Sequence, residues 1–115
     1  MSKNDISQAI GYDWKPAEKR KPRAFEVIRF RRVGPEGDGN EMLATFDGDR
    51  YYIFETNPCR WVTLEEHVFG PGIDRRVRAA AGLPGWLYAY ENVKQAMKYA
   101  PYYAIAVSKI SDIKA

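Results

Sequence analysis

The clearest pattern of apolar and polar positions is the run MLATF-DGD-RYYIF, which extends from Met42 to Phe54. Its two strand-like segments flank Asp47-Gly48, a pair that favours the positive φ angles of hairpin turns. Both faces of the second segment are apolar or aromatic, which is typical of a strand with neighbours on both sides. The pattern therefore predicts a β-hairpin whose second strand lies centrally in a sheet.

A further strand is predicted between residues 24 and 33, although the adjacent Val27 and Ile28 interrupt the alternation. A bulge at that point would turn Phe30 toward the core and Arg29 toward solvent. The glycine-rich stretch that follows, residues 34–40, is typical of a loop.

Helical signals begin after this first half of the chain. Thr63 and Glu66 have the spacing of a capping box, which predicts a short helix that ends at the glycines of residues 70–72. Apolar residues then recur at helical spacing from Ile73 to Ala81 and predict a second helix. Another short helical turn is predicted for residues 4–11.

The last third of the chain predicts a strand, a helix and a strand, at residues 86–90, 91–100 and 102–107. Pro101 separates the last two elements, because proline removes a helical hydrogen bond and clashes with the preceding turn. The elements together indicate an α+β fold. We expect a mainly antiparallel sheet of about five strands with two or three short helices packed against it.

The chain has 115 residues, a length that suits one hydrophobic core. Residues 24–115 are predicted to form this single α+β domain. Residues 1–23 are predicted to form an N-terminal arm, because prolines at 16 and 22 and the absence of an apolar period favour extended chain. Cys59 has no partner for a disulfide, and no secretory signal or membrane span is visible, so we expect a cytoplasmic protein.

Charge is distributed unevenly. The chain carries a net charge of +3, yet residues 15–32 hold eight basic and two acidic residues, a local balance of +6. Such a segment is suited to phosphates or to an acidic surface. The basic residues are Lys15, Lys19, Arg20, Lys21, Arg23, Arg29, Arg31 and Arg32. Three nearby aromatic residues are candidates for stacking on unpaired bases: Tyr12, Trp14 and Phe30.

Signals for catalysis or metal binding are weak. His67 is the only histidine, and its neighbours Glu65 and Glu66 point in different directions on a helix, so neither is set to orient it. Cys59 precedes Arg60, but most free cysteines are small buried apolar residues. One cysteine and one histidine cannot complete a zinc site, and we expect no metal or other cofactor.

The sequence favours a non-enzymatic binding protein that docks through the basic segment on nucleic acid or on an acidic surface of a nucleic-acid-handling protein. The alternative is a structural subunit of a larger assembly or homo-oligomer, of the kind found in phages and mobile elements, because aromatic residues are enriched at interfaces. A third hypothesis is a small enzyme for phosphate-bearing substrates. It would use Arg29 or Arg31 together with Tyr51 and Glu55 in a cleft.

Overall fold

The hairpin predicted around Asp47 is present in the computed structural model, which describes residues 12–34, 37–39, 41–79, 83–92 and 101–114. Strand β4 (Met42–Phe46) pairs antiparallel with β5 (Tyr51–Thr56). The carboxylate of Asp47 accepts hydrogen bonds from the amides of Asp49 and Arg50, both at 2.7 Å. Gly48 has a φ of 102°, so the positive φ angle expected at the turn is confirmed.

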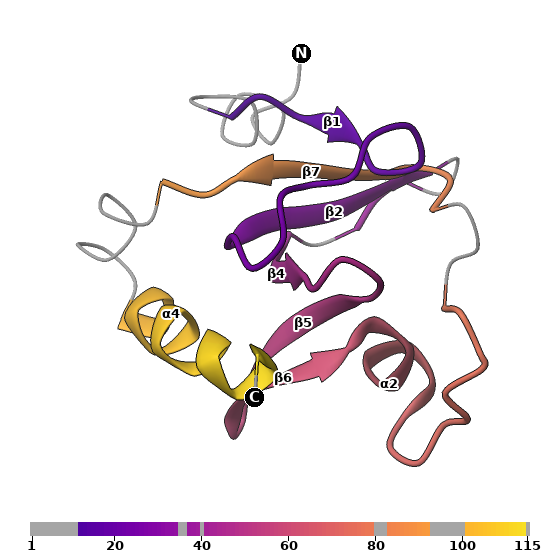
Figure 1. Cartoon of the computed structure of the whole chain (residues 1–115). Helices are drawn as coiled ribbons and strands as arrows, with labels where there is room; N and C mark the ends of the chain where they lie inside the picture. The colour runs from indigo at the N-terminus through magenta and orange to yellow at the C-terminus, as the bar shows by residue number, and fades with distance from the viewer. Residues whose placement is uncertain (1–11, 35–36, 40, 80–82, 93–100, 115) are drawn as a thin grey trace.

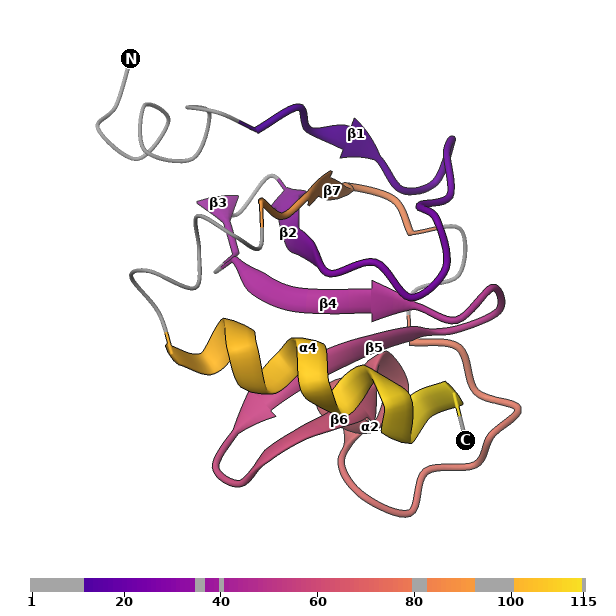
Figure 2. The ribbon, with the colours of Figure 1, turned by 60° about the vertical axis from the view of Figure 1, so that its left-hand side comes forward.

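The hairpin is part of an antiparallel sheet with the order β1-β7-β2-β4-β5-β6 (Figure 1). Strand β3, labelled in Figure 2, pairs separately with β2. The α+β class and the antiparallel pairing are confirmed. Strand β5 has a neighbour on each side as expected, but it lies next to the edge strand β6 and not at the centre of the sheet. The described residues form seven strands instead of about five, and the two-residue strands β1 and β3 account for the difference. The remaining bounds are β1 (Lys15–Pro16), β2 (Ile28–Gly34), β3 (Gly37–Asp38), β6 (Cys59–Thr63) and β7 (Trp86–Tyr90).

One face of the sheet, called the core face here, carries most of the buried residues. The register aligns Ile28, Ala44 and Ile53 across three strands, and Phe30 stacks between the rings of Tyr51 and Trp86. The ring centroids lie 4.9 Å and 4.6 Å from that of Phe30. These stacked rings add to the area burial that stabilises the core.

Helices α2 (Leu64–Phe69) and α4 (Pro101–Lys114) lie on opposite sides of the β5–β6 edge (Figures 1 and 2). The Thr63 hydroxyl accepts a hydrogen bond from the Glu66 amide at 3.1 Å, and α2 ends at Gly70, so the predicted start and end of this helix are confirmed. Helix α4 covers the other face of the sheet, called the α4 face here. The indole of Trp61 donates a hydrogen bond to the Ala106 carbonyl there, at 3.2 Å.

The predicted strand at residues 102–107 is wrong, because this segment belongs to helix α4. Pro101 is tolerated in the first turn of a helix, where its missing amide has no intrahelical acceptor. Tyr103, Ala106 and Ile110 have helical spacing and point toward the sheet side, where Ala106 and Ile110 are buried. Pro101 therefore begins a helix instead of separating a helix from a strand.

The helix predicted from Ile73 is also wrong over residues 73–79, which form turns. The Asp74 carboxylate accepts a hydrogen bond from the Arg76 amide at 2.8 Å, an interaction that competes with helical hydrogen bonds. Glu91 and Asn92 are not helical. Residues 80 and 81, residues 93–100 and the helical turn predicted at 4–11 lie outside the described residues.

The strand predicted from residue 24 begins only at Ile28, since Phe25 has a φ of 62°, which does not fit an extended strand. Phe30 faces the core as expected. The expectation that Arg29 faces solvent is wrong, because its side chain is only 25% exposed and pairs with buried carboxylates on the α4 face. In the part of the chain that the structure describes, no helix is both long and apolar enough to cross a membrane.

Candidate functional site

Residues 17–25 form a strap that connects β1 to β2 across the core face. Its ends are fixed by hydrogen bonds from the Ala17 amide to the Trp86 carbonyl, at 2.9 Å, and from the Phe25 amide to the Phe46 carbonyl, at 2.7 Å. Ala17 and Pro22 are buried. Figure 1 shows the strap passing from the end of β1 in front of β7 to the start of β2. The strap is therefore attached to the sheet at both ends and along its length.

Four of the eight basic residues singled out in the sequence lie on the strap and are exposed: Lys19, Arg20, Lys21 and Arg23. The guanidinium of Arg23 lies 4.0 Å from the centroid of the Tyr90 ring and pairs with the exposed carboxylate of Glu26. No carboxylate among the described residues forms an ion pair with the other three. Among the described residues, a carboxylate therefore pairs with only one of the four strap cations, Arg23.

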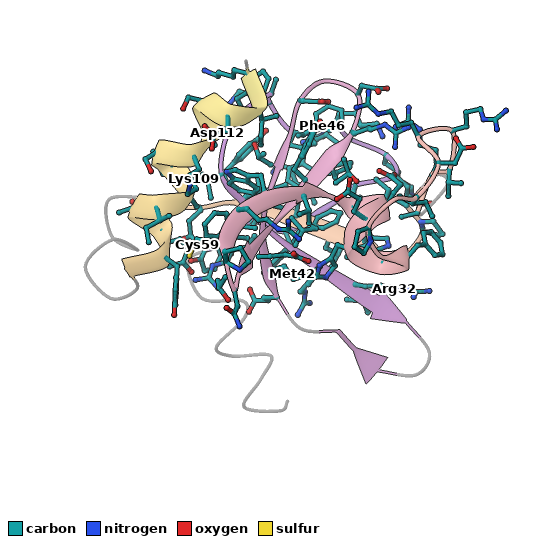
Figure 3. The ribbon with its side chains drawn as sticks, turned by 90° about the horizontal axis from the view of Figure 1, so that it is seen from below. Arg32, Met42, Phe46, Cys59, Lys109 and Asp112 are labelled. Carbon is teal, nitrogen blue, oxygen red and sulfur yellow. The ribbon has the colours of Figure 1, made fainter. Side chains whose placement is uncertain are left out.

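The other four basic residues lie elsewhere. Lys15 contacts the Asp13 carboxylate at β1. Arg29 and Arg31 alternate onto the α4 face, and Arg32 lies at the far end of β2 from the strap, where Figure 3 shows it well away from α4. The structure thus brings half of the predicted set together and separates the rest.

The three aromatic residues considered for stacking are all engaged with the protein. Phe30 is fully buried in the core. The Tyr12 hydroxyl donates a hydrogen bond to Glu91 at 2.6 Å, and the Trp14 ring lies under the guanidinium of Arg31 at 4.9 Å. None of them presents a free ring face next to the strap.

A buried carboxylate organises the α4 face. The side chain of Glu91 is 1% exposed and accepts hydrogen bonds from Arg29 Nε at 2.7 Å and from the Tyr12 hydroxyl. A second nitrogen of Arg29 donates to the Tyr103 hydroxyl at 2.6 Å, and the third lies 3.6 Å from Glu41 Oε1. These five residues, the Arg29 cluster, tie the chain before β1, strand β2, the start of β4, the end of β7 and helix α4 together.

The Arg29 cluster changes the protonation of its tyrosines. Burial, and second the hydrogen bond donated to Glu91, raise the pKa of Tyr12 to about 12. Burial is also the largest cause of the raised pKa of Tyr103. Both hydroxyls therefore stay protonated at pH values at which an exposed tyrosine is ionised.

Alkaline pH should destabilise the protein through Tyr12. Its folded pKa, about 12, exceeds the unfolded value near 10, so its contribution to the free energy of unfolding is complete below pH 10 and is lost as the pH rises toward 12. We expect Tyr12→Phe to flatten this decline in urea unfolding followed between pH 9 and 12. An identical decline in the variant would contradict the assignment.

A pocket of about 620 Å³ lies where β4 and β5 separate. The last pair between these strands is Ala44 with Ile53. Beyond it Leu43 and Met42 stay paired with β2, whereas β5 stays paired with β6 through Thr56. In Figure 3, Met42 marks the β4 side and Cys59 marks the start of β6 beside α4. We call this opening the fork pocket.

Ionisable and aromatic side chains line the fork pocket. Glu41 directly precedes β4, Glu55 belongs to β5, His67 to α2, and Tyr102 and Tyr103 to the start of α4. His67 Nδ1 lies 3.2 Å from Glu55 Oε2, so the partner of the histidine comes from β5 and not from its helical neighbours. This pairing was missed in the sequence because it depends on how α2 packs against the sheet.

The groups proposed for a phosphate-directed enzyme are not brought together. Tyr51 faces the core, whereas Arg29 and Arg31 lie on the opposite face. Cys59 Sγ lies 3.7 Å from the Thr56 carbonyl. Within the described ranges, no group of three or more His, Cys, Asp and Glu side chains is arranged to hold a metal ion.

Comparison with known protein families, with curated proteins and with solved structures finds no match. The functional interpretation consequently depends on the geometry alone.

Proposed function

We propose that this chain is a cytoplasmic, non-enzymatic binding protein whose strap docks on the phosphate backbone of nucleic acid. The observation that carries the proposal is the row of exposed cations from Lys19 to Lys21, none of which forms an ion pair with a carboxylate among the described residues. Lysine and arginine side chains that replace counterions supply most of the affinity in sequence-independent binding.

A second basic segment of the same molecule shows why the strap is preferred. Arg76 pairs with Asp74 and Arg78 pairs with Asp49, with shortest contacts of 2.8 Å and 2.9 Å. Only Arg75 in that loop has no ion pair among the described residues. Ion pairs with neighbouring carboxylates lower the positive electrostatic potential that a polyanion meets. The strap has fewer such ion pairs than this loop, so more of its positive potential remains.

Tyr12, Trp14 and Phe30 all contact other parts of the protein, which bears on whether the strap recognises bases or phosphates. Because these three rings are engaged within the protein, they are not proposed to stack on unpaired bases, and phosphate contacts dominate. Binding of this class is sequence-independent, with dissociation constants of about 10⁻⁴ to 10⁻⁶ M at physiological salt.

The test replaces three strap cations together, as Lys19→Gln, Arg20→Gln and Lys21→Gln. Binding to a fluorescent single-stranded oligonucleotide is measured by anisotropy at several salt concentrations. We expect the slope of log affinity against log salt to fall by about 2, because each phosphate contact on a single strand contributes about 0.7.

The matched control is Arg75→Gln, Arg76→Gln and Arg78→Gln, which removes the same charge from the paired loop. It should leave most of the slope intact, since two of its three arginines are already neutralised. Equal losses in the two variants, or wild-type affinity that does not depend on salt, would refute docking through the strap. If the wild type binds an acidic protein but not the oligonucleotide, the strap is a site for an acidic protein surface and not for nucleic acid.

A further inference from the structure

The fork pocket is separate from the strap in position and in charge. Its volume of about 620 Å³ lies within the range of about 300–1,000 Å³ that is typical of small-molecule sites. Apolar side chains such as Met42, Ile53 and Phe54 contribute much of its lining. A pocket of this kind favours a ligand with an apolar body and a few polar groups.

The ionisable lining of the fork pocket is acidic. Glu41 and Glu55 both line it, and His67 is the one basic side chain among the described lining residues. The guanidinium groups that lie near these carboxylates, those of Arg29 and Arg60, do not line the pocket. A ligand in this pocket therefore meets carboxylates more than cations.

Glu41 lacks a close donor. Its side chain is 20% exposed, and its Oε1 atom is buried without a hydrogen bond to any described residue. The nearest cationic nitrogen, Arg29 Nη1, lies 3.6 Å away, which is too far for a hydrogen bond. The shorter bonds of Arg29 are those to Glu91 and Tyr103. A buried acceptor in this state is stabilised by a donor from a ligand.

Aromatic rings complete the lining. Tyr102 and Tyr103 lie in the first turn of α4 and line the pocket. Tyr102 is 49% exposed, although it is a large aromatic residue. The faces of such rings attract organic cations. Carboxylates and aromatic rings in one partly apolar pocket favour the same ligand chemistry.

We propose that the fork pocket binds a small organic amine, with its ammonium group hydrogen-bonded to Glu41 and its apolar body against the diverging ends of β4 and β5. The separation of the two strands creates the space, and the acidic lining selects the charge. This proposal does not depend on nucleic-acid binding by the strap.

The experiment compares three ligands of similar shape by calorimetry and by NMR titration of the intact protein. Phenethylamine carries the ammonium, phenethyl alcohol is neutral and hydrocinnamate is anionic. We expect the amine to bind at least tenfold more tightly than the alcohol and the acid not to bind. Equal affinity for amine and alcohol would overturn the proposal.

Two variants locate the site. Glu41→Gln removes one charge at nearly constant volume and should weaken amine binding about tenfold, whereas Glu66→Gln, on the exposed side of α2, should leave it unchanged. Tyr102→Leu, at a half-exposed position that the core does not need, should weaken it severalfold even if Glu41→Gln proves unstable. Unchanged amine binding in both pocket variants would refute this location.

The source of the amine is resolved by one further ligand, a lysine blocked at both its amino and carboxyl ends. Tighter binding of phenethylamine than of the blocked lysine indicates a free metabolite. The reverse order overturns the small-molecule assignment and indicates a lysine side chain of another protein.

Discussion

Replacing Glu91 with alanine should lower the free energy of unfolding by about 3 kcal/mol, because removal of one partner from a buried ion pair leaves the other charge uncompensated. The Glu91 side chain is 1% exposed and the Arg29 side chain 25% exposed, so water cannot fully replace the lost carboxylate. Tyr12 loses its acceptor as well. For a chain of this size the midpoint of thermal unfolding should fall by about 12 °C, measured by circular dichroism.

Two comparisons isolate the buried charge as the cause. Glu26→Ala breaks the exposed pair with Arg23 and should cost far less than Glu91→Ala, because ion pairs at a surface contribute little. Replacing both Arg29 and Glu91 with leucine should recover part of the loss, since it avoids the stranded guanidinium but leaves Glu41 without its nearest cation. If Glu91→Ala were as mild as Glu26→Ala, the Arg29 cluster would not stabilise the fold as described.

The parts of the fold that were correctly predicted depend on residues close together in sequence. The hairpin follows from Asp47-Gly48 and its flanking apolar runs, and α2 follows from Thr63, Glu66 and Gly70. Each signal reports hydrogen bonds between residues at most four apart, so it survives without knowledge of the remaining chain.

The wrong predictions arose where a local rule had a competitor. Pro101 fits both the end of one helix and the first turn of the next, and only packing against β6 distinguishes them. The apolar spacing after Ile73 is helical, but the side chain of Asp74 binds the backbone and favours a turn. A tertiary contact decided the first case, and a hydrogen bond between residues two apart decided the second.

The candidate sites show a similar limit. Summing charge over residues 15–32 identified the exposed cations of the strap, yet it could not distinguish them from Arg29, whose partner Glu91 is 62 residues away. The fork pocket depends on the point at which β4 leaves β5, which is a matter of strand register. Neither the Arg29–Glu91 ion pair nor the divergence of β4 from β5 produces a sequence pattern that can be recognised before the strand pairing is known.

Gly85 is another residue whose role appears only in three dimensions. Its φ is 79°, and it lies where the chain enters β7, with its carbonyl accepting a hydrogen bond from the Val33 amide at 2.7 Å. A Cβ atom built at Gly85 would lie 2.4 Å from the Val33 carbonyl oxygen. Contact this short is not tolerated, so β2 and the turn before β7 would have to separate.

Gly85→Ala should therefore destabilise the protein by about 2–4 kcal/mol, the sum of a left-handed backbone cost of about 1 kcal/mol and the displacement of β2 from β7. Gly72→Ala is the matched control, because its φ of 82° is nearly the same while its Cβ would meet nothing within 4 Å. Only the backbone cost, about 1 kcal/mol, applies there. Urea unfolding of the two variants measures the difference, which is the contribution of the close approach between Gly85 and Val33. Equal destabilisation would mean that β7 accommodates a side chain at this position and that the tight junction is not required.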